Sequence, residues 1–413
     1  MHSKVGIPNN VMFAINEMFL CEGFEEEFIC FHTHYNDLRD CRFFMYSDIQ
    51  GVKMPELIKT SYKGDYAIIE MGCAERYYAI DAEICRNMRM TGQANYNIDA
   101  CIELDTQVVS YLRNMFVDWK TVSIPQDKME LFMYLSNKKV NYSSLLYMLE
   151  NSNKITADNQ DICYQNLKAY EMFKNFNFRK YAKKGKISYK RSRKVIERTA
   201  RMQFESLKSD MFRDAMKDFY DSQECIYCLL MKAVLIEIRN SKKSVLNKMK
   251  SLIDFVNDEI GVFMEREMAI CYYFFMHDKR TDRFFKKTKP NSKNIAETIY
   301  GMAWDLTHAR LIERWYDFIP VEIVKYGIHP ILTYDNGLKD VLSLFPIKKM
   351  AIYNGYTIPH FKVRFVDLFP GAIELIFDEA ITLKRKEIFQ NRDMSKIIEQ
   401  LQGEISLVER KER

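Results

Sequence analysis

Two aspartates stand where predicted strands end. The segment 98–105 alternates apolar and polar residues as far as Asp105, and the short apolar segment 331–334 is followed by Asp335. Alternation with a period of two predicts a strand, and apolar residues at helical spacing follow Asp105. In open α/β sheets, ligands bind beyond the carboxyl ends of the strands. We therefore expect both carboxylates at a functional edge, with an ordinary turn residue as the alternative for Asp335.

Two further acids lie in predicted helices. Glu150 comes near the end of an apolar helical segment, where a surface position is the simplest interpretation. Asp305 shares one side of a helix with His308 when successive residues are turned by about 100°. Thr307 and Arg310 fall together on the other side, the expected solvent face. An acid on a mostly apolar face is costly unless it is paired or holds a metal, so a buried salt bridge is the alternative for Asp305.

These four acids have one chemical use in common if the fold brings them together. Clustered carboxylates bind Mg²⁺ or Mn²⁺, hard ions that prefer oxygen ligands. Such an ion activates water and offsets the charge that builds up on a phosphate during in-line displacement. The predicted cofactor is therefore Mg²⁺ or Mn²⁺, and four ordinary ion pairs are the alternative. The candidate catalytic and metal-binding residues are Asp105, Glu150, Asp305 and Asp335.

The order and local context of the four acids resemble those of the PIN-domain nucleases. In that family a strand ends in Asp followed by Thr or Ser, as at Asp105, although Gln107 stands here in the place of the usual Asn. A helical Glu comes next, which Glu150 matches. An Asp opening a helix rich in small residues and leucine follows, and Asp305 resembles it. The last element is a strand of the type Ile-x-Thr-x-Asp, matched by residues 331–335.

The resemblance implies a fold and an activity. The fold would be α/β, with a PIN-like three-layer α/β/α core and a parallel sheet formed by residues 93–150 and 295–375. The activity would be that of a metal-dependent endoribonuclease, with DNA as the less favoured substrate. Many relatives are toxins of bacterial toxin–antitoxin pairs, so a toxin or defence-type effector with an inhibitory protein partner is implied. A non-catalytic PIN-like scaffold that binds nucleic acid or protein is the alternative function.

The chain departs from a compact PIN domain in the long interval between Glu150 and Asp305. Residues 151–294 are free of proline before Pro290 and have helical periodicity, so we predict a large helical insertion. Glu267, in the same interval, is an alternative or additional metal ligand to Glu150.

The two ends of the chain form the remaining predicted regions. Residues 1–92 contain strand-like segments at 27–31, 42–46 and 66–70, rich in aromatic and β-branched residues. We therefore expect a small N-terminal α+β region. Residues 376–413 are expected to form a C-terminal helical tail.

The predicted insertion contains a basic segment. Between residues 179 and 201, eleven Lys or Arg occur with one acid, Glu197. Tyr181 and Tyr189 are interleaved with them and could stack on bases, so RNA is the expected partner, and a solvated face is the alternative. The candidate nucleic-acid-binding residues are Lys183, Lys184, Lys190, Arg191, Arg193 and Lys194.

Composition and net charge limit the class of protein but do not identify a binding partner. The 413 residues are 47% hydrophobic and 28% charged, as in soluble globular proteins, and the net charge of +5 is too small to prove a polyanionic partner. No uncharged apolar run approaches the roughly 20 residues of a membrane helix. Ten scattered cysteines indicate a reducing, cytoplasmic location, and Cys225 and Cys228 are interpreted as buried small hydrophobic residues. The oligomeric state is open, and a homo-oligomer is compatible with the sequence.

Overall fold

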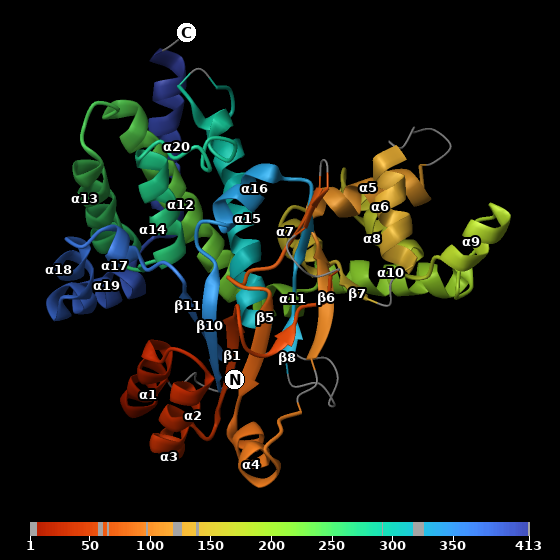
Figure 1. Ribbon diagram of the computed structural model, residues 1–413. Helices are drawn as coiled ribbons and strands as arrows, with labels where there is room; N and C mark the ends of the chain where they lie inside the picture. The colour runs from red at the N-terminus through yellow and green to blue at the C-terminus, as the bar shows by residue number, and fades with distance from the viewer. Residues whose placement is uncertain are drawn as a thin grey trace.

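The computed structural model describes residues 6–56, 61–63, 66–95, 98–118, 126–137, 140–290, 292–316 and 326–411. The described part of the chain is mixed α/β, with two sheets near the centre and helices grouped on either side of them (Figure 1). The expected α/β class is confirmed at that level. Four segments of the predicted core lie outside the described residues: 96–97, 119–125, 138–139 and 317–325.

The first sheet joins the N-terminal region to the C-terminal part of the chain. Its order is β11-β10-β1-β5-β2, and neighbouring strands are antiparallel. Residues 1–92 therefore share a sheet with residues 347–361, and the strand predicted at 42–46 is confirmed within β1. The strands are β1 (Cys41–Ser47), β2 (Val52–Lys53), β5 (Arg76–Ile80), β10 (Ile347–Tyr353) and β11 (Tyr356–Phe361).

Short helices cover part of this sheet. Ile15 and Phe31, on two of these helices, share a buried cluster with Phe43 of β1 and Ile80 of β5. This apolar contact fixes the N-terminal helices on the sheet. The helices are α1 (Asn9–Leu20), α2 (Phe24–Thr33), α3 (Tyr35–Leu38) and, after β5, α4 (Ala82–Thr91).

The strand predicted at 27–31 is wrong, because these residues belong to α2. Phe24 and Phe31 are separated by about two helical turns, and acidic residues in the first turn favour a helix N-terminus. Glu27 is buried and pairs with Lys349 of β10 at 2.7 Å between Oε1 and Nζ. Aromatic content alone favoured a strand, whereas helical spacing and packing on the sheet determine the outcome.

The second sheet contains the predicted junctions between strands and helices. Its order is β3-β4-β9-β6-β7, and β8 also pairs with β6. β6 runs parallel to β7, β8 and β9, whereas β4 is antiparallel to β9. The strands predicted at 66–70 and 98–105 are confirmed as β4 and β6. The strands are β3 (Ser61–Lys63), β4 (Tyr66–Ile69), β6 (Ile98–Leu104), β7 (Asn141–Ser143), β8 (Tyr326–Ile328) and β9 (Ile331–Thr333).

Three parallel strands of this sheet lead directly into helices. β6 is followed by α5 (Thr106–Phe116), β7 by α7 (Leu145–Ser152) and β9 by α16 (Asn336–Leu342). Parallel strands have their carboxyl ends at the same edge of a sheet, so the first turns of these helices lie at one edge.

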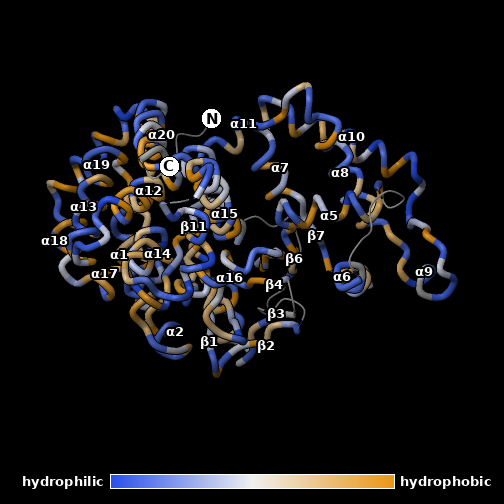
Figure 2. Tube along the Cα trace, turned by 90° about the horizontal axis from the view of Figure 1, so that it is seen from above, coloured by the Kyte–Doolittle hydropathy of each residue, from blue (hydrophilic) through white to orange (hydrophobic). Residues whose placement is uncertain are grey.

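One helical group packs beside the second sheet. Leu167 of α8 and Phe204 of α10 belong to a buried cluster that also contains Ile102 of β6 and Leu332 of β9. In two perpendicular views, α9 lies at the outer edge of the molecule (Figures 1 and 2). The helices of this group beyond α5 and α7 are α6 (Gln126–Asn137), α8 (Gln160–Lys174), α9 (Phe178–Lys184), α10 (Arg193–Lys208) and α11 (Asp210–Ala215).

The other helical group is built on α12 (Lys217–Arg239) and α15 (Ile295–Trp315), which pack against each other in one extensive hydrophobic cluster. Residues 151–294, predicted as a helical insertion, thus divide between the two groups. The remaining segments of this group are α13 (Val245–Phe255), a π-helical turn (Val256–Ile260), α14 (Glu265–Phe275), a 3₁₀ turn (Lys286–Thr288), α17 (Phe365–Leu368), α18 (Ala372–Phe377), α19 (Glu379–Asn391) and α20 (Met394–Lys411).

The expected solvent face of helix α15 is only partly exposed in the structure, which corrects that expectation. Thr307 is 0% exposed, and Arg310 donates from Nε to Oε1 of Glu267 on α14 at 2.9 Å. At the start of the helix, the backbone N–H of Ile295 donates to Glu409 of α20 at 2.7 Å. A helical wheel assumes one solvent side, but α12, α14 and α20 contact this helix and cover much of its surface.

Two further expectations concern buried cysteines and membrane-spanning helices. Cys225 and Cys228 are free thiols buried in α12, as predicted. Within the described ranges, no helix combines the length and hydropathy needed to cross a membrane.

Candidate metal centre

Asp105 is fixed where β6 meets α5. Its Oδ1 accepts from the backbone N–H of Thr106 at 2.6 Å, so it caps the helix, and its Oδ2 accepts from the hydroxyl of Thr333 at 2.7 Å. The Asp105 backbone N–H donates to the Leu332 carbonyl at 3.1 Å, which ties it to β9. With 4% exposure, this carboxylate is held between the ends of two parallel strands.

Asp335 occupies the equivalent place after β9. Its Oδ1 accepts from the backbone N–H groups of Gly337 (2.6 Å) and Leu338 (2.9 Å), which caps α16. Its own N–H donates to the hydroxyl oxygen of Thr333 at 2.9 Å. The Thr333 hydroxyl therefore connects Asp105 and Asp335, and the predicted turn and functional roles of Asp335 are compatible.

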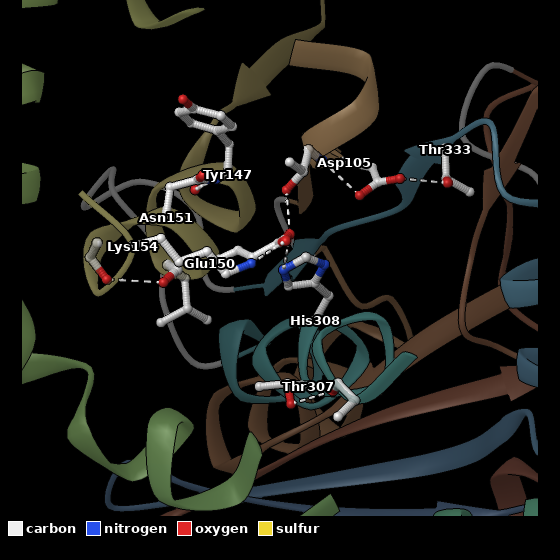
Figure 3. Close-up of polar contacts among 12 residues, drawn as sticks. Asp105, Tyr147, Glu150, Asn151, Lys154, Thr307, His308 and Thr333 are labelled. Atoms are coloured by element: carbon white, nitrogen blue, oxygen red, sulfur yellow. Dashed lines mark hydrogen bonds and ion pairs between the residues drawn. The ribbon is translucent and has the colours of Figure 1, made fainter. Parts of the chain in front are cut away.

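Glu150 reaches the same place from α7. Its Oε2 accepts from the Thr106 hydroxyl at 2.6 Å, and its Oε1 accepts from Nζ of Lys154 at 2.9 Å. Nε2 of His308, on α15, lies 4.0 Å from Oε2. Figure 3 shows Glu150 from α7 and Lys154, just beyond the end of that helix, meeting His308 from α15, with Asp105 and Thr333 beside them.

Asp305 and His308 complete the group from α15. They are three residues apart and therefore share a helix face. One ligand atom each from Asp105, Asp305 and His308 lies within 4.8 Å of the others. His308 is 1% exposed, whereas Asp305 is partly exposed, which leaves the group open to solvent on its side.

Burial and mutual repulsion make the carboxylates hold protons tightly. Burial raises the pKa of Asp105 to about 7, and the charges of Glu150 and Asp335 act in the same direction. Burial also raises the pKa of Asp305 well above its ordinary value, with repulsion from the other three carboxylates as the second cause. A cation placed among these groups would relieve the repulsion and favour their ionised forms.

The pKa values of Glu150 and His308 are lowered instead of raised. Burial alone would raise the pKa of Glu150, but His308 and Lys154 hold it below its usual value. Burial lowers the pKa of His308 to about 4, so the imidazole is neutral at pH 7 and Lys154 is then the cation beside Glu150. The imidazole hydrogen-bonds to the backbone of Leu146, while its buried Nε2 has no hydrogen-bond partner. A neutral imidazole with such an Nε2 is suited to bind a metal.

The structure brings the four predicted acids to one place, as the sequence-based hypothesis required. Glu267, the alternative ligand, is elsewhere. Both of its carboxylate oxygens accept hydrogen bonds from Arg310, and it is 0% exposed between α14 and α15. The positive charge of Arg310 lowers the pKa of Glu267 despite burial, so its charge is already compensated. This corrects the expectation that Glu267 could join or replace Glu150.

Sequence reasoning did not identify His308 as a candidate ligand or Thr106, Thr333 and Lys154 as neighbours of the acids. The sequence held only local signals for these residues. His308 follows Asp305 by three residues, a same-face spacing on a helix, and Lys154 follows Glu150 by four residues, just beyond the end of α7. The two threonines stand beside the aspartates in sequence, but only the pairing of β6 with β9 shows that Thr333 bonds to Asp105.

The predicted nucleic-acid-binding residues lie apart from this centre. All six are exposed, at the end of α9, in the loop that follows it and in the first turn of α10. α10 has 16 residues, about 24 Å of helix, and leads from the outer edge of the molecule towards α11 (Figure 1). The structure therefore places the basic surface on α9 and at the beginning of α10, whereas the acids come from α7, α15 and the ends of β6 and β9.

Comparisons with known proteins add no relative from which a role could be transferred. No protein-family model matches this chain, and neither a curated protein nor a solved structure does.

Proposed function

We propose that this protein is a metal-dependent nuclease that cleaves RNA, with Mn²⁺ as the preferred ion. The observation that carries the proposal is the group of ligand atoms from Asp105, Asp305 and His308, all within 4.8 Å of one another. Glu150 and Asp335 add negative charge to the same place. Carboxylates suit both Mg²⁺ and Mn²⁺, but an imidazole ligand favours Mn²⁺.

A PIN-like three-layer core is part of the proposal. Helices follow three parallel strands of the second sheet, as in a β-α arrangement. In β9, Leu332 belongs to the cluster with α5 and α8, whereas its neighbour Ile331 belongs to the cluster with α12 and α15. Because successive strand residues point to opposite faces, helices cover both faces at this strand. This supports an α/β/α order around the acids.

The side chains have distinct roles in the proposed reaction. A bound ion would activate water and offset the charge of the attacked phosphate. Asp105, Asp305 and His308 would hold this ion, and the hydroxyl of Thr333 fixes the orientation of the Asp105 carboxylate. Asp335 would contribute the remaining negative charge needed to attract a divalent cation.

Glu150 and Lys154 form the other half of the proposed site. Glu150 has a lowered pKa and is ionised at neutral pH, so its carboxylate can orient the attacking water through a hydrogen bond. Lys154 lies beside it, with Nζ 5.1 Å from the centre of the Tyr300 ring. Its fixed positive charge would stabilise charge that develops on a phosphate oxygen.

The basic surface supports a polyanionic substrate that extends beyond the centre. Lys190, Arg191 and Arg193 are exposed where α10 begins and are available for phosphate contacts. RNA is preferred over DNA because of the resemblance to PIN-domain nucleases. Matched RNA and DNA hairpins would test this preference separately from cleavage itself.

The proposed function is tested by cleavage of a labelled RNA hairpin by the full-length protein. We expect cleavage in Mn²⁺, none in EDTA, and a decrease of roughly 100-fold or more for Asp105→Asn and Asp335→Asn. Asn can still cap a helix, so both variants should fold. Asp254→Asn, at an exposed position of α13, is the matched control and should cleave normally.

Two results would contradict the proposal. One is unchanged cleavage in both centre variants. The other is salt-dependent RNA binding without metal-dependent cleavage in the wild type, which would favour the non-catalytic scaffold.

A further inference from the structure

A second group of metal-ligand types lies farther back along β6. Cys101 and Glu103 belong to β6, and His329 lies in the connection between β8 and β9. One ligand atom from each lies within 4.8 Å of the others. Unlike the acidic centre, this group combines a thiol, a carboxylate and an imidazole.

Glu103 is the unusual member of the group. It is 1% exposed, and Nδ1 of His329 lies 3.0 Å from its Oε1. Its other oxygen, Oε2, is buried without a hydrogen-bond partner. A buried carboxylate oxygen left without a partner is costly, so this atom points to a ligand that would satisfy it.

The backbone holds the three residues in place. β8 pairs with residues 98–100 of β6, and β9 pairs with Glu103 and Leu104. His329 therefore lies between the two segments that pair with β6. The N–H of Glu103 also donates to the carbonyl of Pro330 at 2.9 Å. The position of the imidazole relative to Glu103 is therefore set by strand pairing.

We propose that Cys101, Glu103 and His329 bind one Zn²⁺. Thiolate, imidazole and carboxylate are the ligands that zinc takes in proteins, in tetrahedral arrangements. Cys101 is only half-buried, so zinc could enter from solvent and keep a water molecule as its fourth ligand.

A nucleophilic role for Cys101 fits the surroundings less well. Burial raises the pKa of its thiol far above the ordinary value, and the neighbouring Glu103 carboxylate adds to this effect. Lys174, the nearby cation, is already 3.6 Å from Glu171. Activated cysteines have lowered pKa values, whereas zinc displaces the thiol proton on binding.

Bound zinc would connect the strands that carry the acidic centre. Glu103 precedes Asp105 by two residues on β6, and His329 precedes β9, which ends just before Asp335. The ion would therefore fasten β6 to the β8–β9 connection without contacting the residues proposed to bind Mn²⁺. The proposal does not depend on the nuclease function.

The test uses full-length protein equilibrated with Zn²⁺ and freed of excess metal by dialysis. We expect about one tightly bound zinc per chain in the wild type and its loss in Cys101→Ser and His329→Gln. In the cobalt-substituted wild type, an absorption band from thiolate-to-Co²⁺ charge transfer should appear, and it should be absent from Cys101→Ser. Cys73→Ser, at another half-buried cysteine, is the matched control and should keep both signals.

Asp305→Asn separates this site from the acidic centre. We expect this variant to retain the zinc and the cobalt band, even if it loses cleavage. Unchanged zinc content in both Cys101→Ser and His329→Gln, or a wild type without the cobalt band, would overturn the proposal. Either result would leave the Mn²⁺-dependent cleavage test unaffected.

Discussion

The acidic centre depends on side chains whose charges are only partly compensated in the metal-free protein. Asp105 has two hydrogen-bond donors, yet its pKa is raised to about 7. The pKa of Asp305 is raised well above its ordinary value by burial and by repulsion from three neighbouring carboxylates. Such groups destabilise the folded chain when ionised, which gives the centre a measurable dependence on pH.

The sign of that dependence differs among the groups. When folding raises the pKa of a carboxyl, the folded protein loses stability as pH rises from the unfolded pKa of that carboxyl, near 4, through its folded value. For Asp105 that window runs from about 4 to about 7. His308 acts oppositely: its pKa is lowered to about 4, so stability is lost as pH falls from about 6.5 towards 4. Comparison of single variants separates these contributions.

Asp305→Asn should therefore stabilise the metal-free protein at high pH. We expect the free energy of unfolding at pH 8 to rise by about 1–3 kcal/mol relative to the wild type, because a repelled charge is removed. Near pH 4, where the wild-type carboxyl is protonated, the two proteins should differ little. Urea unfolding at both pH values in EDTA measures this, and equal stability at pH 8 would show that Asp305 carries no repelled charge.

His308→Gln should alter the choice of metal. Loss of the imidazole removes the ligand that favours Mn²⁺, while the carboxylates that bind either ion are kept. We expect cleavage in Mn²⁺ to fall at least about tenfold, with a smaller decrease in Mg²⁺. Cleavage rates with each ion, over a range of concentrations, give the ratio. Equal decreases with both ions would argue that His308 is not a ligand.

At this scale the sequence predicted the acids better than their partners. Asp105 was found because strand alternation and a following helix are local patterns, and Asp335 because it follows a short apolar strand. His308 was seen only as a neighbour of Asp305, because an imidazole on a helix is ordinary until the facing strands are known. The link from Thr333 to Asp105 spans 228 positions, so no local pattern reveals it.

Among the secondary-structure elements, α15 has the largest role in forming the centre. It carries Asp305 and His308 to the ends of β6 and β9, and three neighbouring helices hold it. Glu267 of α14 pairs with Arg310, and Glu409 of α20 accepts from the first N–H of the helix. These contacts position Asp305 and His308 without touching them.

Glu267→Gln tests this supporting role. Removal of one partner from a buried ion pair leaves the other charge uncompensated, so we expect a loss of roughly 3 kcal/mol in the free energy of unfolding. The folded variant should still bind Mn²⁺ and cleave RNA at low temperature. Its effect on stability at pH 8 is opposite in sign to that of Asp305→Asn. Lost Mn²⁺ binding in a folded Glu267→Gln protein would place Glu267 in the metal centre after all.

Helices and strands were predicted correctly where the residue pattern fitted only one type of secondary structure. The junction between β6 and α5 follows from strand alternation that changes to helical spacing at Asp105. Prediction failed at 27–31, where aromatic residues suited either element and packing on the first sheet favoured a helix. It also failed for the outer face of α15, because periodicity within that helix does not show that α14 and the distant α20 pack against it.

In the whole molecule, the basic surface lies on the helical group of α9 and α10, whereas the acidic centre also includes Asp305 and His308 of α15 from the other group. The basic residues lie at the outer end of α10, as Figure 2 also shows for the neighbouring α9. A substrate reaching both would have to contact residues from both helical groups and the second sheet.

The triple variant Lys190→Ala, Arg191→Ala, Arg193→Ala should weaken RNA binding without changing metal binding. Each lost phosphate contact lowers the slope of log affinity against log salt by about 0.7, so three lost contacts lower it by about 2. Fluorescence anisotropy across a salt series measures the slope. The matched control changes three exposed lysines of the other helical group, Lys242, Lys243 and Lys250, and should keep it. An unchanged slope in the first variant would show that this surface is not the RNA contact.

The large-scale organisation was the least predictable part. Residues 151–294 have one helical pattern, yet they contribute to two hydrophobic clusters on different sides of the sheets. The strands near the N-terminus join both sheets through pairing with strands more than 250 residues away. Such pairings depend on tertiary contacts that periodicity does not encode.

The most direct test of the central claim is Mn²⁺ binding measured by electron paramagnetic resonance. The signal of free Mn²⁺ decreases on binding, so a titration gives both stoichiometry and affinity. The wild type should bind at least one Mn²⁺, and Asp105→Asn and Asp305→Asn should each weaken that binding at least about tenfold, whereas Asp254→Asn should not. Mn²⁺ binding that is unchanged in both centre variants would contradict the account.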